Sequence, residues 1–300
     1  ATRGAHRRPA GARLNAALAW YFVAVWGAGY IATKIGLQYA PPFTFLTLRF
    51  GFGLLCLLPA VLLLKTDWPR NRTEFAHLAV AGLLMHFVQL GGSHYAQYLG
   101  MSAGVAALII SCQPLLTALL VFCLFKEKIH PGQWLGVAIG LAGVALVVWH
   151  KIDVREVGAA SLACTAIALA GVTAATLYQK TFAPAADLKA ASFIQFAVAF
   201  AAFAPLAVAV EGFEVRPSLP LLASIVFLVI FTSILGVSAL YVLLRHGAAT
   251  RVTGMMYLPP VFAVVLELAM FGVLPSALTV AGIALACAGV AMTVWSGRRS

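Results

Sequence analysis

The polar side chains with the clearest chemistry lie inside an apolar stretch, LLMHFVQLGGSHYAQ, at residues 83–97. At about 100° per residue of α-helix, His86, Gln89, Ser93 and Gln97 fall within an arc of about 80°. Polar groups on so apolar a helix would be costly if they faced lipid, so this stripe should face protein or water. We expect the stripe to line a polar path through the protein. The alternative is that His86 hydrogen-bonds a neighbouring helix and only helps packing.

His86 is the member of this stripe with the widest chemistry. A neutral imidazole donates and accepts hydrogen bonds, and it takes up a proton near physiological pH. His86 is therefore a candidate for binding a carboxylate or for carrying a proton. His94 and Tyr95 point away from the stripe.

A second polar stripe lies near the C-terminal end of the sequence. Its members follow a 4-3-4-3 spacing and share one helical face: Thr253, Tyr257, Pro260, Val264 and Glu267. Glu267 is the one acid that we place well inside an apolar segment, where carboxylates often relay protons or receive cations. The alternative for Glu267 is a structural ion pair with Arg49 or Lys34.

Two prolines and three further side chains complete the candidate set. Pro114 and Pro260 lie inside apolar segments, where a proline removes a backbone donor and leaves a carbonyl free. Such carbonyls are tolerated in a membrane when they line a cavity or find partners. Both prolines are candidates for gating kinks, with plain packing as the alternative. Trp26, Tyr30 and Ser111 are candidates for the path, although a Trp and Tyr face is also ordinary helix packing.

The composition places these side chains in a membrane protein. Hydrophobic residues make up 62% of the 300 residues and charged residues 10%, whereas a soluble domain carries about 25% charged residues. Many apolar runs reach the roughly 20 residues that a membrane-spanning helix needs. We expect an all-α polytopic membrane protein with ten transmembrane helices. The expected spans lie near residues 15–37, 42–64, 76–97, 102–125, 132–149, 157–181, 189–210, 219–243, 249–271 and 275–296.

The basic residues set the expected orientation. An even number of spans puts both termini on the same side of the membrane. With Arg49 inside a span, fifteen Lys and Arg residues fall on that side and four on the other, so the positive-inside rule makes both termini cytoplasmic. The net charge of +11 follows from this topology, and we expect the lipid bilayer, but no nucleic acid, as a partner. His94 is expected near the outer end of its span, within reach of the interface.

The chain contains an internal repeat at a shift of 146 residues. The residues that coincide include Lys34 and Lys180, Pro59 and Pro205, Tyr95 and Tyr241, Pro114 and Pro260, Gly136 and Gly282, Gly143 and Gly289, and Trp149 and Trp295. Each copy is expected to hold five helices, an odd number, so the second copy must be inverted relative to the first. The expected segments are a basic tail at 1–14, a first repeat at 15–149, a linker at 150–156, a second repeat at 157–296 and a tail at 297–300. Inverted repeats are found in many transporters, with the substrate site near the midplane where the halves meet.

Three stretches of the first repeat carry a resemblance to a known family: VWGAGYIATKIGL, PPFTFLTLRFGFG and SAGVAALIISCQPLLTALLVFCLFKEKIHP. They resemble the EamA-type transporters of the drug/metabolite transporter superfamily, and the resemblance extends over residues 15–296. It implies ten helices in two inverted halves around a central cavity, and movement of small metabolites, often outward. The second repeat is the more divergent one. Its equivalents of Trp26 and Gly27 are Val172 and Thr173.

Together these features predict a secondary transporter that exports amino acids or related compounds by alternating access. His86 and Glu267 are the candidates for proton coupling, and facilitated diffusion is the alternative. Transport of drugs or cations, or of nucleosides or sugars, is the alternative on the same fold. An intramembrane enzyme is a distant alternative, because neither H-E-x-x-H nor G-x-S-x-G occurs.

The remaining sequence features limit cofactors and location. The G-x-x-x-x-G-K-[ST] motif does not occur, so we expect no ATP hydrolysis by this chain and no cofactor. The five cysteines form no C-x-x-C pair, which predicts neither a disulfide framework nor a metal site. The composition favours a bacterial inner membrane, and we expect a monomer or a homodimer.

Overall fold

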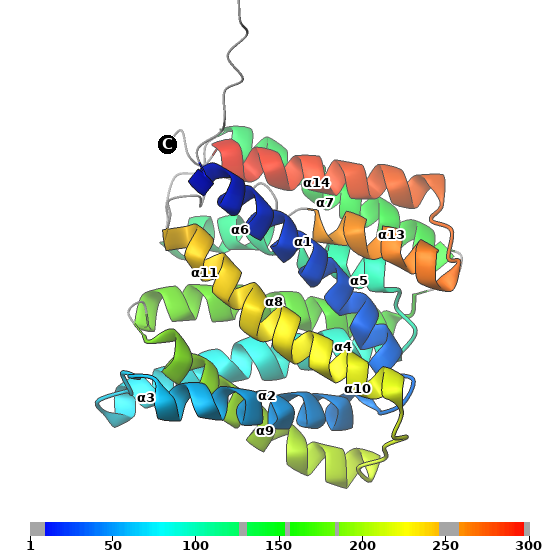
Figure 1. Cartoon of the computed structure of the whole chain (residues 1–300). Helices are drawn as coiled ribbons and strands as arrows, with labels where there is room; N and C mark the ends of the chain where they lie inside the picture. The colour runs from blue at the N-terminus through cyan, green and yellow to red at the C-terminus, as the bar shows by residue number, and fades with distance from the viewer. Residues whose placement is uncertain (1–9, 126–130, 154–156, 184–185, 246–257, 297–300) are drawn as a thin grey trace, which may run out of the picture.

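The computed structural model describes residues 10–125, 131–153, 157–183, 186–245 and 258–296, and every regular element in these ranges is a helix (Figure 1). The elements are α1 (Ala10–Gly36), α2 (Pro42–Leu63), α3 (Arg72–Gly82), η1 (Leu83–Leu90), α4 (Gly91–Tyr98), α5 (Ala103–Ile110), α6 (Gln113–Phe125), α7 (Pro131–Asp153), α8 (Ala159–Phe182), α9 (Leu188–Glu211), α10 (Leu219–Val226), η2 (Phe227–Gly236), α11 (Val237–Arg245), α13 (Pro259–Phe271) and α14 (Ala277–Ser296). In this part of the chain, seven helices are long and apolar enough to cross a membrane. The all-α, polytopic membrane class predicted from the sequence is confirmed.

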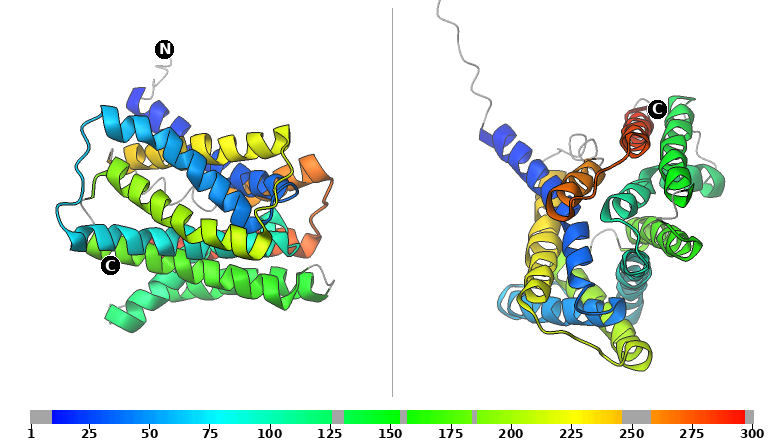
Figure 2. Two further views of the ribbon diagram at one scale, coloured as in Figure 1. Left: turned by 90° about the horizontal axis from the view of Figure 1, so that it is seen from below. Right: turned by 90° about the vertical axis from the view of Figure 1, so that its right-hand side faces the viewer.

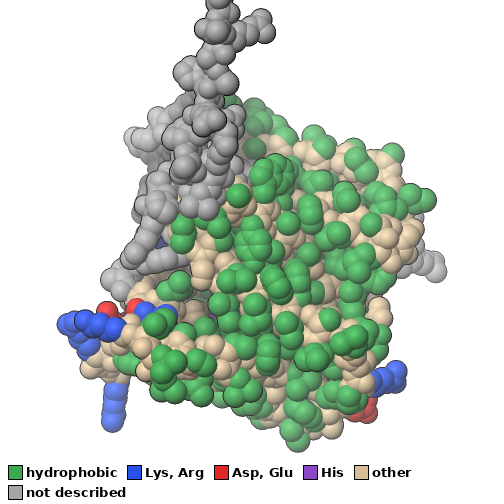
Figure 3. Space-filling model, viewed as in Figure 1, with side chains coloured by type: hydrophobic (Ala, Val, Ile, Leu, Met, Phe, Trp, Pro, Cys, Tyr) green, Lys and Arg blue, Asp and Glu red, His purple; other side chains and the backbone are tan. Residues whose placement is uncertain are grey.

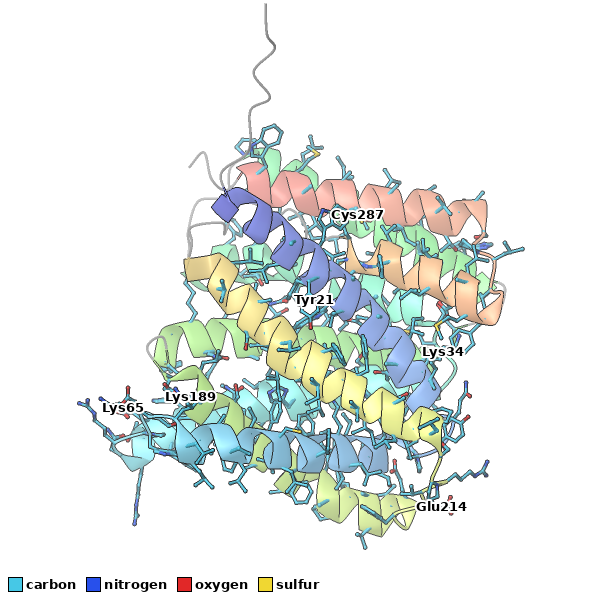
Figure 4. The ribbon with its side chains drawn as sticks, in the orientation of Figure 1. Tyr21, Lys34, Lys65, Lys189, Glu214 and Cys287 are labelled. Carbon is cyan, nitrogen blue, oxygen red and sulfur yellow. The ribbon has the colours of Figure 1, made fainter. Side chains whose placement is uncertain are left out.

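The surface of the helix bundle is apolar along its sides and charged at its ends. Figure 3 shows hydrophobic side chains over most of the visible face, with Lys, Arg and acidic side chains at two opposite ends. Figure 4 labels Lys65 and Lys189 at one of these ends and Lys34 and Glu214 toward the other. Large apolar side chains such as Leu55 and Val208 are exposed on the helix sides. A surface of this kind is suited to lipid contact rather than to water.

Several helices start at capping residues. The side chains of Asn71, Ser102 and Ser218 accept hydrogen bonds from backbone amides in the first turns of α3, α5 and α10. The Asp187 side chain accepts hydrogen bonds from the Lys189 and Ala190 amides at the start of α9. These side chains satisfy amides that have no partner within the helix. α9 ends at Gly212, whose φ of 62° lies in the left-handed region that glycine adopts readily.

Three of the long helical runs are interrupted. The run from α3 to α4 contains the π-helical segment η1, and the run from α10 to α11 contains η2. The run from α5 to α6 is broken at Ser111 and Cys112, where the chain makes a turn. π-helical segments are rare and are frequently found at functional sites. The interruptions therefore direct attention to the middle of these runs.

Helix bounds recur at a shift of 146 residues, the same shift that aligns the sequence. The matching first residues are Pro42 of α2 and Leu188 of α9, Gln113 of α6 and Pro259 of α13, and Pro131 of α7 and Ala277 of α14. The last residues of the two π segments, Leu90 and Gly236, are related in the same way. The backbone thus repeats the pattern that the sequence shows, including its irregular parts.

Two pairs of these corresponding helices pack side by side and antiparallel. A Cβ atom added at Gly143 in α7 would lie 2.6 Å from the Gly282 carbonyl oxygen of α14, and one added at Gly289 would lie 2.6 Å from the Gly136 carbonyl oxygen. An early residue of α7 therefore meets a late residue of α14. The same holds for α2 and α9, where Thr44 hydrogen-bonds Glu211. Figures 1 and 2 place α7 with α14 along one edge of the molecule and α2 with α9 along the opposite edge.

The contacts of α1 and α8 with other helices also correspond at the 146-residue shift. α1 packs against η2, α11 and α13, whereas its counterpart α8 packs against η1, α4 and α6. Each of these contacts maps onto its counterpart under the same 146-residue shift. α1 thus packs on helices from the C-terminal part of the chain, and α8 packs on helices from the N-terminal part.

Candidate functional site

A group of polar side chains lies between α1, α2, α4 and η2. The Arg49 guanidinium of α2 donates to the Ser233 Oγ of η2 at 3.2 Å and lies 3.5 Å from the His94 Nε2 of α4. The same His94 nitrogen lies 3.4 Å from the Thr33 Oγ1 of α1. We call Thr33, Arg49, His94 and Ser233 the Arg49 cluster. It joins three helices of the first repeat to one π segment of the second.

Arg49 is a buried charge without a buried countercharge. Only 6% of Arg49 is exposed, its Nε makes no hydrogen bond, and no acid among the described residues pairs with it. The buried Glu267 pairs with Lys34, and the half-buried Glu211 accepts from the amides at the start of α2. Burying an unpaired charge costs several kcal/mol per ion. The cluster is therefore a positively charged site in an apolar surrounding.

His86 lies against both α2 and α9. Its ring packs against Phe50 of α2 and Phe196 of α9, with centroid distances of 5.3 Å and 5.2 Å. Gln195, the residue before Phe196, packs against Gly82 just ahead of η1, because a Cβ atom added at Gly82 would lie 2.7 Å from the Gln195 Cα. The His86 Nδ1 and the Gln195 Nε2 are buried and make no hydrogen bond. Polar atoms in this state are rare in folded proteins and need an explanation.

The π segment η1 changes the face on which the two histidines lie. In a regular α-helix, His86 and His94 would be separated by about 80° around the axis, at 3.6 residues per turn. One extra residue in a π-type turn moves the later residues back by about 100°. Both histidines accordingly contact α2, His86 at Phe50 and His94 at Arg49. His94, which the sequence places near the outer interface, is 3% exposed and belongs to the Arg49 cluster.

The other residues of the predicted first stripe are buried in the same run. Ser93 is 1% exposed and Gln89 is 9% exposed. The Gln89 backbone lies against α8, because a Cβ atom added at Gly171 would be 3.2 Å from the Gln89 amide nitrogen. Gln97 is 8% exposed and its Oε1 makes no hydrogen bond. Gln89, Ser93 and Gln97 are thus buried, whereas His86 is half-buried.

The two predicted path residues of α1, Trp26 and Tyr30, pack against different neighbours. Trp26 stacks on Phe22 at 4.5 Å and approaches Gly236 of η2. Tyr30 packs against the apolar cluster that contains Met101. Thr253 and Tyr257, from the second predicted stripe, lie outside the described residues.

The structure brings Ser111 and Pro260 together. Both line a small apolar hollow between α5, α13 and α14, next to the break at residues 111–112. Pro114 and Pro260 are each the second residue of their helix, α6 and α13. A proline at a helix start removes no intrahelical hydrogen bond. Neither proline bends a continuous helix in the described part of the chain; Pro114 follows a break.

Glu267 has three partners at the other end of α13. Its carboxylate accepts from the Lys34 ammonium at 2.6 Å and from the Ala103 and Gly104 amides at 3.3 Å and 3.1 Å. The amides belong to the start of α5, where the helix dipole favours a negative charge. Of the two partners named from the sequence, Lys34 is the one that forms the ion pair. Glu267 connects α13 to α1 and α5.

Sequence reasoning gave too little weight to Arg49, His94 and Ser233. From the sequence alone, Arg49 is a candidate partner for Glu267. A charge in the middle of FTFLTLRFGFGLLCLL is also itself a signal of a functional site. His94 was placed on the wrong face because the α-helical period was applied through η1. Among the described residues, no group of three or more His, Cys, Asp and Glu side chains could hold a metal ion.

Comparison with known proteins places the chain among transporters. The model of the EamA-like transporter family matches residues 14–149 and 157–295. The "Uncharacterized inner membrane transporter YedA" of Escherichia coli K12 is 28% identical over 251 residues, which cover 81% of this chain and 78% of that protein. The "Probable amino-acid metabolite efflux pump" of Salmonella typhimurium is 24% identical over 298 residues, which cover 95% of this chain and 96% of that protein. A crystal structure with 19% identity matches 95% of this chain and 98% of its own with a TM-score of 0.64, which indicates a shared fold.

Proposed function

Because the chain belongs to the EamA-like transporter family, we propose that it is a secondary transporter that moves small metabolites by alternating access. The observation that carries the proposal is the position of the Arg49 cluster. The Arg49 cluster takes side chains from both proposed repeats. It lies among side chains that are otherwise mostly apolar. Substrate sites of transporters with inverted repeats lie in such a position.

The proposed architecture is ten transmembrane helices in two inverted five-helix repeats, with both termini cytoplasmic. Its support is the recurrence of helix bounds at 146 residues and the antiparallel packing of α2 with α9 and of α7 with α14. Two corresponding helices that pack antiparallel are expected from a two-fold axis in the membrane plane. A mobile pair of such halves has two related conformations, each open to one side of the membrane.

We assign the export of amino acids or related compounds as the substrate class and direction. The name of the Salmonella relative supports this assignment. The proposed contacts along the path are His86, Gln89, Ser93, Trp26, Tyr30, Ser111, Thr253 and Tyr257. Proton coupling is assigned to His86 and Glu267, and Pro114 and Pro260 are assigned as gating positions at the helix starts. Facilitated diffusion and transport of drugs, cations, nucleosides or sugars are the alternatives.

Uptake into proteoliposomes tests the proposal. The purified protein is reconstituted, and labelled amino acids are added with and without a pH gradient. We expect saturable uptake of one class of amino acid and its loss in the variant with His86→Ala and Gln89→Ala. A His86→Gln variant should have a flatter pH profile of transport if His86 carries the coupled proton.

The matched control is Lys65→Ala, a change of an exposed residue at the end of the bundle. Uptake of nucleosides or cationic drugs in place of amino acids would move the protein to the alternative substrate classes. Uptake that survives the double change would return His86 and Gln89 to a packing role.

A further inference from the structure

The buried polar atoms without hydrogen bonds follow the internal repeat. In the described part of the chain they are the Arg49 Nε, His86 Nδ1, His94 Nδ1, Gln97 Oε1, Gln195 Nε2 and Thr232 Oγ1. Four of these six atoms belong to residues that correspond at the 146-residue shift, because Arg49 corresponds to Gln195 and His86 to Thr232. The unpaired groups are thus concentrated at two related places.

Each place takes one side chain from the α2–α9 pair and one from the π segment of the other repeat. At the first place, Arg49 of α2 donates to Ser233 of η2, next to Thr232. At the second place, Gln195 of α9 packs against Gly82, one turn before His86 of η1, and His86 contacts Phe196, the residue after Gln195. We call Arg49 with Thr232 and Ser233 the Arg49 half-site, and Gln195 with His86 the Gln195 half-site. Residues 49 and 195 are 6% and 7% exposed, so both half-sites are buried.

Two aromatic rings connect the half-sites. Phe50 and Phe196 directly follow Arg49 and Gln195, correspond at the same shift, and meet edge to face at 5.3 Å. The Arg49 guanidinium carbon lies 5.9 Å from the centre of the Phe50 ring, and His86 touches both rings. The rings provide an apolar contact between two polar ends. A small solute that spans the half-sites would therefore place its apolar part against Phe50 and Phe196.

The two half-sites differ in charge. The first carries a guanidinium that no acid in the described ranges pairs with, whereas the second carries a neutral amide and an imidazole. Guanidinium groups bind carboxylates through two parallel hydrogen bonds, and such charge-assisted bonds are roughly twice as strong as neutral ones. An amide and an imidazole both donate and accept hydrogen bonds, so they can bind either a donor or an acceptor group of a solute. The asymmetry favours a solute with one anionic end.

We propose that the substrate is a small solute whose carboxylate binds Arg49 and whose second polar group binds Gln195 and His86. This inference rests on the proposed transport function and deepens it by naming the group that the site recognises. Because the half-sites are buried, a solute reaches them when the repeats move apart, as alternating access requires. Cations that lack a carboxylate are repelled by Arg49 and are not substrates.

Binding to the unmodified protein gives the first test. The probes are L-leucine, L-phenylalanine, L-threonine and L-glutamine, each paired with its carboxamide, in which the carboxylate is replaced by a neutral amide. Thermal unfolding of the purified protein in detergent is followed with each probe. We expect at least one acid to raise the unfolding midpoint, and its amide to bind about 10- to 100-fold more weakly, because one charge-assisted contact is lost. Equal protection by acids and amides, or protection by none of the acids, would overturn the proposal.

Two variants use the repeat as an internal control. Arg49→Gln gives both half-sites a glutamine and should remove the preference for acids over amides. Arg49→Gln combined with Gln195→Arg moves the guanidinium to the corresponding place without changing the composition, and it should restore part of that preference. If Arg49 served only to hold α2 against η2, Arg49→Gln would lower the unfolding midpoint but leave the acid preference unchanged, which would contradict the proposal. Arg49→Lys keeps the charge and provides a second comparison if Arg49→Gln does not fold.

The binding and transport readouts fail separately. Acid-selective binding without transport in proteoliposomes would overturn the proposed function and leave the carboxylate site standing. Saturable transport that does not discriminate acids from amides would overturn the carboxylate site and leave the transporter standing.

Discussion

At the residue scale, the buried and half-buried charges Arg49, Glu211 and Glu267 fall into two kinds. Glu211 and Glu267 are each held by backbone amides at the start of a helix, and Glu267 also by Lys34. Arg49 has hydroxyl and imidazole neighbours but no acid among the described residues. Both acids thus already have donors, whereas Arg49 has no carboxylate partner among the described residues.

The Lys34–Glu267 ion pair should contribute to stability. Lys34→Met leaves the buried Glu267 carboxylate with its two amide donors but without its countercharge, so we expect the free energy of unfolding to fall by at least about 1.5 kcal/mol. Combining Lys34→Met with Glu267→Gln removes both charges and should recover part of this loss. Chemical unfolding in mixed detergent micelles measures both effects. Lys65→Met is the exposed control, for which a change within about 0.5 kcal/mol is expected; a loss of the same size in Lys34→Met and Lys65→Met would rule out a stabilising pair.

The sequence identified the kind of residue at the site better than its partners. His86, Gln89 and Ser93 stand out because polar side chains in an apolar segment are conspicuous, and their role in transport stays a prediction. Lys34, the partner of Glu267, is one of the two that the sequence indicates. The role of Arg49 required knowledge of which acids were already engaged. That information depends on tertiary contacts such as Glu211 with α2, which no local pattern encodes.

At the element scale, the π segments change which side chains of their helical runs face the neighbouring helices. η1 brings His86 and His94 to one face, and η2 carries Thr232 and Ser233. The positions of the long helices could be predicted from apolar runs, because a span needs a fixed length. The π segments could not, because one extra residue in a turn leaves hydropathy almost unchanged while it rotates every later side chain.

The start of α9 offers a pH-dependent test of a helix cap. Burial acts to raise the pKa of the Asp187 carboxyl, but hydrogen bonds from the Ala190 and Lys189 amides and from the Lys189 ammonium outweigh it, so the pKa lies below its ordinary value. The ionised cap therefore stabilises the fold above the unfolded-state pKa, and this contribution is lost as the pH falls through the folded-state pKa. We expect Asp187→Ala to cost about 1 kcal/mol at neutral pH and progressively less below about pH 4.

Ser218 provides the matched control for this experiment. It caps α10 through the Leu221 amide but does not titrate. The effect of Ser218→Ala on the unfolding midpoint should be independent of pH. An Asp187→Ala effect that is equally constant would show that the cap acts without its charge.

At the scale of the whole molecule, the two ends of the bundle should face opposite sides of the membrane. In a variant without its five cysteines, Lys65→Cys and Glu214→Cys place one thiol at each exposed end. The positive-inside rule predicts that a membrane-impermeant maleimide labels Glu214→Cys in intact cells and Lys65→Cys only after permeabilisation. The reverse pattern would place both termini outside the cytoplasm, and labelling of both in intact cells would contradict a fixed orientation.

The repeat was the large-scale feature most visible in the sequence. Its shift could be read from pairs such as Pro59 and Pro205, because both copies keep residues with special backbone roles. What the sequence did not contain was the mutual packing of the copies. The antiparallel contacts of α2 with α9 and of α7 with α14 depend on shape complementarity between residues far apart in the chain.

The central claim is that one buried site opens alternately to the two sides of the membrane. The most direct measurement uses a thiol at Ser233, whose hydroxyl accepts a hydrogen bond from Arg49. In the cysteine-free protein with Ser233→Cys, reconstituted in one orientation, an impermeant thiol reagent is added to one side at a time, with and without the transported solute. We expect the Ser233→Cys thiol to react with reagent added on either side, and to react more slowly when the solute is bound. Reaction from one side only, or from neither, would contradict alternating access at this site.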